Sequence, residues 1–188
     1  MAAGAILFMV SAAAPQRALA APLDWGFGAS PRAQAIYVES RAGGQGSLRP
    51  GLPTAASSPY NDGDFVGTLV VQRLGRRVGI YEGETMANMD KGAGRFSFSG
   101  LDFGNMGLIG HNRGRTNGFF DFVRLLEYGD SLVVETSNTT RTYTVSGFHL
   151  IEETDFSLLS DFGDNRLTLV TCMEYMPGYR RVAVARRD

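Results

Sequence analysis

Cysteine is almost absent from this sequence of 188 residues, and so is any excess of one charge. A single residue, Cys172, cannot form an internal disulfide and cannot supply a zinc site by itself. With 18 Lys and Arg against 19 Asp and Glu, the chain also lacks the basic surplus of a dedicated nucleic-acid-binding protein. The fold must therefore rest on a hydrophobic core, and no nucleic-acid partner is expected.

Long hydrophobic runs are missing too. The apolar run from Ala2 to Ala14 is shorter than the roughly 17 to 25 residues that a membrane-spanning helix needs. It is followed by Ala18-Leu19-Ala20, a small-x-small triplet of the kind that signal peptidase cuts. We therefore interpret residues 1–20 as a signal-peptide-like segment whose removal leaves a protein that acts outside the cytoplasm. Residues 21–60 are rich in Ala, Gly, Ser and Pro, and they predict a flexible linker before a folded domain at 61–188.

From residue 61 the sequence changes to short β-prone runs separated by glycine-containing turns. One segment differs, because the apolar residues of 119–126 recur at helical spacing between Asn117, a good helix cap, and Gly129. Several strands at short intervals with one helix favour a mostly β fold, a largely antiparallel barrel or sandwich. The expected strands are 67–71, 77–81, 132–135, 141–145, 167–172 and 180–185.

Three residues whose side chains could take part in catalysis lie where predicted strands end or begin. Cys172 ends the run 167–172, and His111 opens a glycine-flanked polar loop after an apolar run, so both are expected at the rim of the fold. A thiolate is a nucleophile, and a nearby imidazole can take or return its proton near neutral pH. Arg180 begins the last predicted strand, and its guanidinium can hold a carbonyl or an oxyanion. This set favours a cysteine peptidase or transpeptidase.

The order and the local sequence of these residues resemble the sortases, the cysteine transpeptidases of the Gram-positive cell surface. Residues 168–172 match the family's Thr-Leu-x-Thr-Cys signature, residues 180–185 match its Arg-x-x-x-Val-x strand, and Gly110-His111 matches its Gly-His pair. The resemblance covers about residues 63 to 186. Papain-like enzymes fit less well, because their cysteine usually precedes their histidine. Further similarity to the family lies at 67–71, 80–83, 104–107, 119–120, 125 and 129–130.

The resemblance implies an eight-stranded β-barrel with one or a few short helices and the site at one end, so that 61–188 is the catalytic domain. Cys172 would attack the carbonyl after the Thr of a Leu-Pro-x-Thr-Gly-like sorting signal, and an amine would resolve the thioacyl enzyme. His111 would protonate the leaving amine and deprotonate the incoming one. Arg180 would steady substrate and oxyanion, and Thr171 would add a backbone or hydroxyl contact. No cofactor is implied.

The same resemblance implies the partners and the location. The substrates would be sorting-signal-bearing proteins, either surface proteins to be anchored or pilins to be polymerised. The amine acceptor would be a peptidoglycan precursor or a pilin lysine. The enzyme would act outside the cytoplasm of a Gram-positive bacterium, secreted or associated with the cell membrane or cell wall.

Apolar residues of the segment 152–166 have two interpretations. Phe156, Leu158 and Leu159 are predicted to line a pocket for the signal's Leu and Pro, or else to cover the end of the barrel together with Phe162.

Two other sets of polar residues need an interpretation. Some sortases bind calcium through acidic loop residues, and Glu82, Glu84 and Asp90 are candidates here, but such residues are more often only solvated, and no metal site is assigned. The second histidine, His149, lies in a β-prone run and is interpreted as structural.

The two adjacent arginines and the reaction outcome leave alternatives open. Successive strand residues point to opposite faces, so only one of Arg180 and Arg181 can reach Cys172, and the period of two does not say which. The family pattern, which places a valine four residues after its arginine, selects Arg180, because Val184 lies four residues after it.

Two other functions stay open: an exported cysteine peptidase in which water resolves the thioester, and a non-catalytic exported β-barrel binding module.

Overall fold

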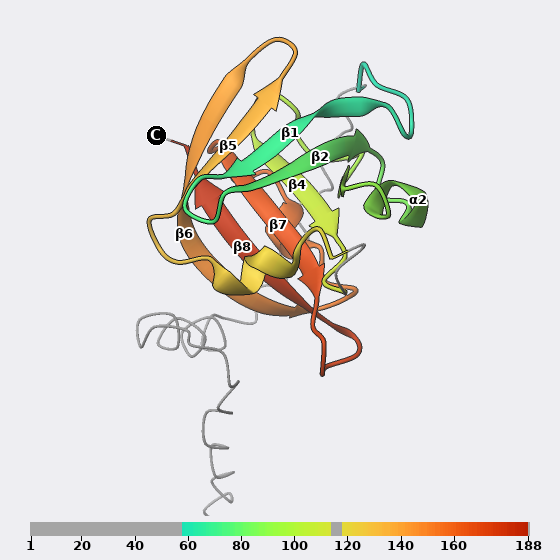
Figure 1. Ribbon diagram of the computed structural model, residues 1–188, viewed down its shortest axis with the longest axis vertical. Helices are drawn as coiled ribbons and strands as arrows, with labels where there is room; N and C mark the ends of the chain where they lie inside the picture. The colour runs from blue at the N-terminus through green and yellow to red at the C-terminus, as the bar shows by residue number, and fades with distance from the viewer. Residues whose placement is uncertain (1–57, 114–117, 188) are drawn as a thin grey trace, which may run out of the picture.

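Eight strands form a closed barrel in the computed structural model, which describes residues 58–113 and 118–187 (Figure 1). The order around the barrel is β1-β2-β3-β4-β7-β8-β6-β5, and β5 pairs with β1 to close it. The prediction of a mostly β, eight-stranded barrel is confirmed. The signal-peptide-like segment 1–20 and all but the last three residues of the linker predicted over 21–60 lie outside the described residues. The strands are β1 (Phe65–Val71), β2 (Arg76–Glu82), β3 (Ala93–Arg95), β4 (Asn105–Gly110), β5 (Ser131–Thr136), β6 (Thr140–Glu152), β7 (Arg166–Cys172) and β8 (Tyr179–Arg186).

Most neighbouring strands are antiparallel, as the sequence predicts, and short turns join several of these pairs. The β1–β2 hairpin turns at Gly75, whose φ of +60° lies in the region that favours glycine. Strands β5 and β6, and β7 and β8, form two further hairpins. Two pairs differ, because β2 with β3 and β4 with β7 are parallel. A parallel pair needs a crossover connection, and the chain makes one between β4 and β7 by passing through β5 and β6.

The helices of the described residues are all short: α2 (Met86–Met89), and the 3-10 helices η1 (Asp121–Leu125) and η2 (Ser157–Leu159). The helix predicted over 119–126 is therefore wrong in type and length. Phe120 and Phe122 are both fully buried, and residues two apart do not share one face of an α-helix. Packing of both rings thus overrides the helical spacing. Within the described residues, no helix has the length and apolar character to cross a membrane.

Apolar side chains fill the barrel and also cover one patch of its outside. Leu167 and Leu169 of β7 point into the main core, whereas Val170 belongs to a second cluster on the outer face. β7 is therefore buried on both faces, and all of its residues except Cys172 are buried, the polar Thr168 and Thr171 included. The members of this outer cluster are Phe96, Leu159, Val170, Val182 and Val184.

A buried ion pair attaches the three-residue strand β3 to β2. Glu82 and Arg95 are register partners, with 3% and 1% of their surfaces exposed. Arg95 Nε and Nη2 donate to the two carboxylate oxygens at 2.6 and 2.5 Å, and Nη1 donates to the Ser99 carbonyl. The fork-to-fork geometry satisfies both charges. Phe96 of the outer cluster directly follows this anchor.

Removal of one partner should therefore destabilise the fold. Glu82→Ala leaves the Arg95 charge buried and unpaired, so we expect a loss of about 3–5 kcal/mol in the free energy of unfolding, measured by urea denaturation. Glu135→Ala is the control, because its pair with Arg77 is exposed and should contribute about 0–1 kcal/mol. Equal losses in the two variants would contradict this account.

Candidate active site

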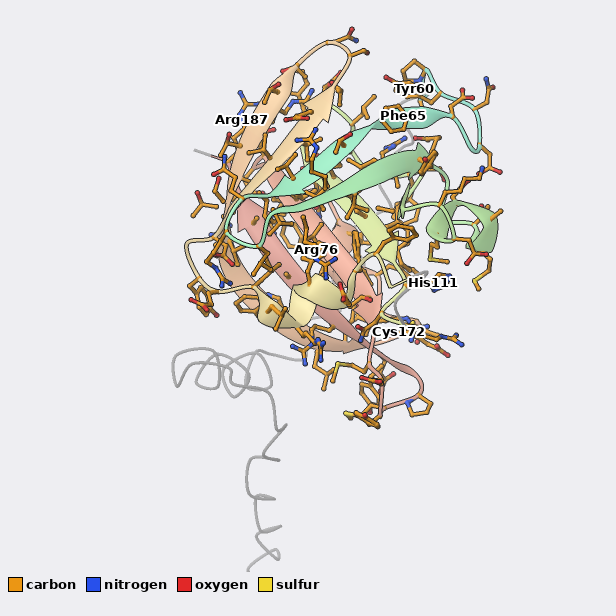
Figure 2. All side chains as sticks on the ribbon, viewed as in Figure 1. Tyr60, Phe65, Arg76, His111, Cys172 and Arg187 are labelled. Atoms are coloured by element: carbon orange, nitrogen blue, oxygen red, sulfur yellow. The ribbon has the colours of Figure 1, made fainter. Side chains whose placement is uncertain are left out.

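The parallel pairing of β4 with β7 brings His111 beside Cys172. Gly110 pairs with Thr171, so the next residue on each strand is one of the two predicted site residues. The Thr171 hydroxyl donates to the Gly110 carbonyl at 2.8 Å, and Asn112 Nδ2 donates to the Cys172 carbonyl at 3.1 Å. Figure 2 shows both side chains at one end of the barrel, with Arg187 at the other end. Hydrogen bonds on either side of the two residues thus hold the strand ends together.

His111 is more enclosed than its glycine-flanked loop suggests. Only 8% of the residue is exposed, and its carbonyl accepts a hydrogen bond from Phe120 N at 2.9 Å. The imidazole Nε2 lies 3.5 Å from Asp90 Oδ1, and Asp90 caps the C-terminus of α2. The ring therefore lies at the end of the barrel but is covered, whereas Cys172 is half-buried.

Strand pairing decides which arginine faces the thiol. Cys172 and Arg180 are directly opposite each other on antiparallel β7 and β8, and opposite residues project to the same face. Arg181 pairs instead with Thr171 and follows the face of Ala183, which is in the barrel core. The guanidinium on the Cys172 face is thus that of Arg180, in agreement with the choice made from the family pattern.

An acidic residue that sequence reasoning did not single out contacts this guanidinium. Arg180 Nη2 donates to Glu153 Oε2 at 2.7 Å, and Nη1 donates to the Tyr179 carbonyl at 3.0 Å. Glu153 lies just beyond β6, whose Ile151 pairs with Arg180. The contact depends on the register of β6 against β8, which cannot be read from the sequence.

A pocket of about 270 Å³ opens on the outer face beside these residues. Phe156, Leu158 and Leu159 all line it, and Leu159 also packs in the outer cluster. The segment thus lines a pocket and also covers part of the barrel, whereas the Phe162 ring stacks on the Arg166 guanidinium. The remaining lining residues are Glu84, Phe96, Phe98, Ile109, Ile151, Glu153, Asp155, Val170 and Arg180.

Thr171 has a different environment from the pocket residues. Its side chain lies on the opposite face of β7 from Cys172, is 1% exposed, and already donates its hydroxyl to Gly110. The structure therefore does not bring this hydroxyl into the pocket. Its role is to join the ends of β4 and β7.

Comparison with known proteins identifies the family. The sortase domain, as a protein-family model, matches residues 69–188. The chain belongs to the sortase family. It is 22% identical over 138 residues to Sortase A of Bacillus anthracis, covering 73% of this chain and 66% of that protein. It is 27% identical over 114 residues to Sortase A of Listeria monocytogenes, covering 60% and 51%.

A solved structure agrees with this assignment at the level of the fold. A sortase from Actinomyces oris superposes with a TM-score of 0.64 at 24% identity, over 70% of this chain and 84% of that one. The chain spans less than two thirds of the length of either Sortase A protein.

The acidic candidates for calcium are dispersed in this sortase fold. Glu82 is engaged by Arg95, Glu84 accepts a hydrogen bond from Ser97 N at 3.2 Å, and Asp90 lies near His111. Among the described residues, no three His, Cys, Asp or Glu side chains gather as a metal site would require.

The second histidine lies within β6, away from the pocket lining. His149 pairs with Val182 across β6 and β8 and is half-buried. Burial first, and then the positive charge of Arg166, lower the pKa of His149 from its ordinary 6.5. This environment favours the neutral imidazole, as expected of a structural residue.

We therefore expect His149 to titrate below 6.5 in an NMR titration of the imidazole signals. Between the folded and unfolded pKa values of His149, the unfolded chain binds more protons than the folded chain. The contribution of His149 to the free energy of unfolding is therefore fully present above the unfolded value and decreases as the pH drops through 6.5. The two histidines give two signals, which His149→Gln assigns. In urea, the variant should lose less stability than the wild type between about pH 7.5 and about pH 5.5. A His149 midpoint at or above 6.5 would contradict this.

Proposed function

We propose that this chain is a cysteine transpeptidase that cleaves a Leu-Pro-x-Thr-Gly-like sorting signal and transfers the acyl group to an amine. The observation that carries the proposal is the placement of Cys172 between His111 and Arg180 on three neighbouring strands, β4, β7 and β8. Membership of the sortase family supports it. The adjoining apolar pocket supplies a surface for the peptide.

In the first step the Cys172 thiolate attacks the carbonyl carbon after the Thr of the signal. Arg180 faces the same side as the sulfur and donates to the carbonyl oxygen, which becomes an oxyanion. When the tetrahedral species collapses, the C–S bond remains, the C–N bond breaks, and the leaving amine takes a proton from the His111 imidazolium. The products are a thioacyl enzyme, a neutral imidazole and a free amine.

In the second step an acceptor amine resolves the thioester. Neutral His111 takes the proton of the attacking amine, a new C–N bond forms, and the C–S bond breaks to return the thiolate. Atoms and charges then balance without an oxidant, a reductant or a metal in the scheme. Burial of His111 keeps this proton exchange away from bulk water.

The pocket gives the signal its apolar contacts. Phe156, Leu158 and Leu159 form one side, and they would hold the Leu and Pro side chains of the peptide while its backbone runs toward Cys172. Thr171 would contribute indirectly, by holding the end of β4 that carries His111. Burying one or two aliphatic side chains contributes about 1.5–3 kcal/mol each.

The partners and location follow from the same reaction. The substrates would be surface proteins or pilins that carry the signal, and the acceptor a peptidoglycan precursor or a pilin lysine. The signal-peptide-like residues 1–20 support action outside the cytoplasm, in secreted form or in association with the cell membrane or wall.

A peptide assay with and without an amine tests the reaction. We expect a fluorogenic sorting peptide to give a ligated product when an oligoglycine acceptor is present, and Cys172→Ala to abolish the product while the thermal melt stays unchanged. Hydrolysis alone, with no ligation at any acceptor concentration, would favour the peptidase. A Cys172 thiol that neither cleaves peptide nor reacts with an alkylating agent near neutral pH would favour the binding module.

The paired arginines give a matched test of the site. Arg180→Ala removes the donor on the Cys172 face, so kcat/KM should fall roughly 10²- to 10³-fold. Arg181→Ala makes the same change one residue later on the opposite face and should remain within about threefold of wild type. Arg180→Lys should also be poor, because an ammonium lacks the planar fork. An active Arg180→Ala beside an inactive Arg181→Ala would overturn the assignment.

A further inference from the structure

Four side chains from four neighbouring strands lie at the same end of the barrel. In the order β4, β7, β8, β6 they are His111, Cys172, Arg180 and Glu153, each at a strand end. The first three take part in the proposed reaction. Glu153 has no part in it, yet it makes a 2.7 Å ion pair with the arginine.

We propose that Glu153 is a positioning residue, which holds the Arg180 guanidinium in the orientation that faces the reacting carbonyl. This inference rests on the proposed transpeptidase function. Arg180 has the thiol strand on one side and the Glu153 strand on the other, so the carboxylate fixes the guanidinium from the side away from Cys172.

Glu153 is itself held firmly enough to act in this way. Its backbone N–H donates to the Gly178 carbonyl at 2.8 Å, which continues the β6–β8 ladder one residue beyond Glu152 and Tyr179. The carboxylate therefore projects from a hydrogen-bonded strand end. A charge-assisted bond from such a base restricts an arginine side chain that otherwise has many rotamers.

The composition of the pocket explains why the guanidinium needs this restraint. Two other carboxylates, Glu84 and Asp155, line the same pocket as Arg180. If Glu153 loses its charge, these carboxylates compete for the guanidinium and draw it away from the carbonyl site. Glu153 thus selects one of several possible ion pairs.

Stability does not account for the pair. The Arg180 and Glu153 side chains are 23% and 50% exposed, and pairs in such surroundings contribute little to folding. Glu153 also begins the connection that carries Phe156, Leu158 and Leu159, so one contact sets the arginine relative to the apolar side of the pocket.

The test compares Glu153→Gln with Glu152→Gln in the full chain. Both remove one carboxylate charge from an exposed residue, but Glu152 lies on the other face of β6 from Ile151 and the pocket. We expect Glu153→Gln to lower kcat about tenfold with KM within about twofold, since misplacement of a catalytic group affects the transition state most. Glu152→Gln should match wild type, and neither variant should change the melting temperature.

A double mutant establishes that Glu153 acts through Arg180. In an Arg180→Ala background, Glu153→Gln should change the single-turnover rate by less than about twofold, because the group it positions is gone. Wild-type kcat in Glu153→Gln, or the same tenfold loss in both backgrounds, would overturn the inference while leaving the transpeptidase intact. An inactive wild-type protein would overturn the proposed function and the inference together, whereas an active Arg180→Ala variant would overturn the role of Arg180 and this inference while leaving the transpeptidase function intact.

Discussion

The parallel alignment of β4 with β7 is the constraint on which the rest of this structure depends. It joins two segments 61 residues apart, and β5 and β6 form the crossover that makes a parallel pair possible. Without this pairing the barrel would not be closed. His111, which follows Gly110, and Cys172, which ends β7, would then not lie next to each other. The hydroxyl of Thr171 and the amide of Asn112 reinforce the junction beside His111 and Cys172.

The register between neighbouring strands decides which side chains lie next to Cys172. In a sheet, a slip of one residue exchanges the two faces of a strand. On β8 such a slip would present Arg181 beside the sulfur and turn Val182 away from the outer cluster. The apolar side chains that β7 and β8 bury on both faces therefore do more than stabilise the barrel, since they also keep one guanidinium next to one thiol.

Much of the fold follows from local patterns, and the failures have identifiable causes. The hairpins at Gly75 and between β7 and β8 were predictable because their turns and alternation lie close together in sequence. The parallel pairs were not, because nothing local marks which distant strand becomes a neighbour. The helix predicted over 119–126 was wrong because Phe120 and Phe122 both pack in the core, ring against ring. Cys172 was predicted because it lies in a local sequence motif. Glu153 was not, because its contact with Arg180 depends on the pairing of β6 with β8.

The buried Glu82–Arg95 pair has a consequence for how the pocket adapts to ligands of different width. It fixes the backbone immediately before Phe96, so that side of the pocket is stationary. Phe156, whose ring packs edge-on against Phe96 with centroids 6.4 Å apart, is 46% exposed and belongs to a stretch of exposed residues, 152–157. On the proposed function, a wider peptide would therefore be accommodated by displacement of Phe156 rather than of Phe96. Efforts to alter peptide selectivity are best directed at that connection, where substitutions leave the charged anchor of the barrel undisturbed.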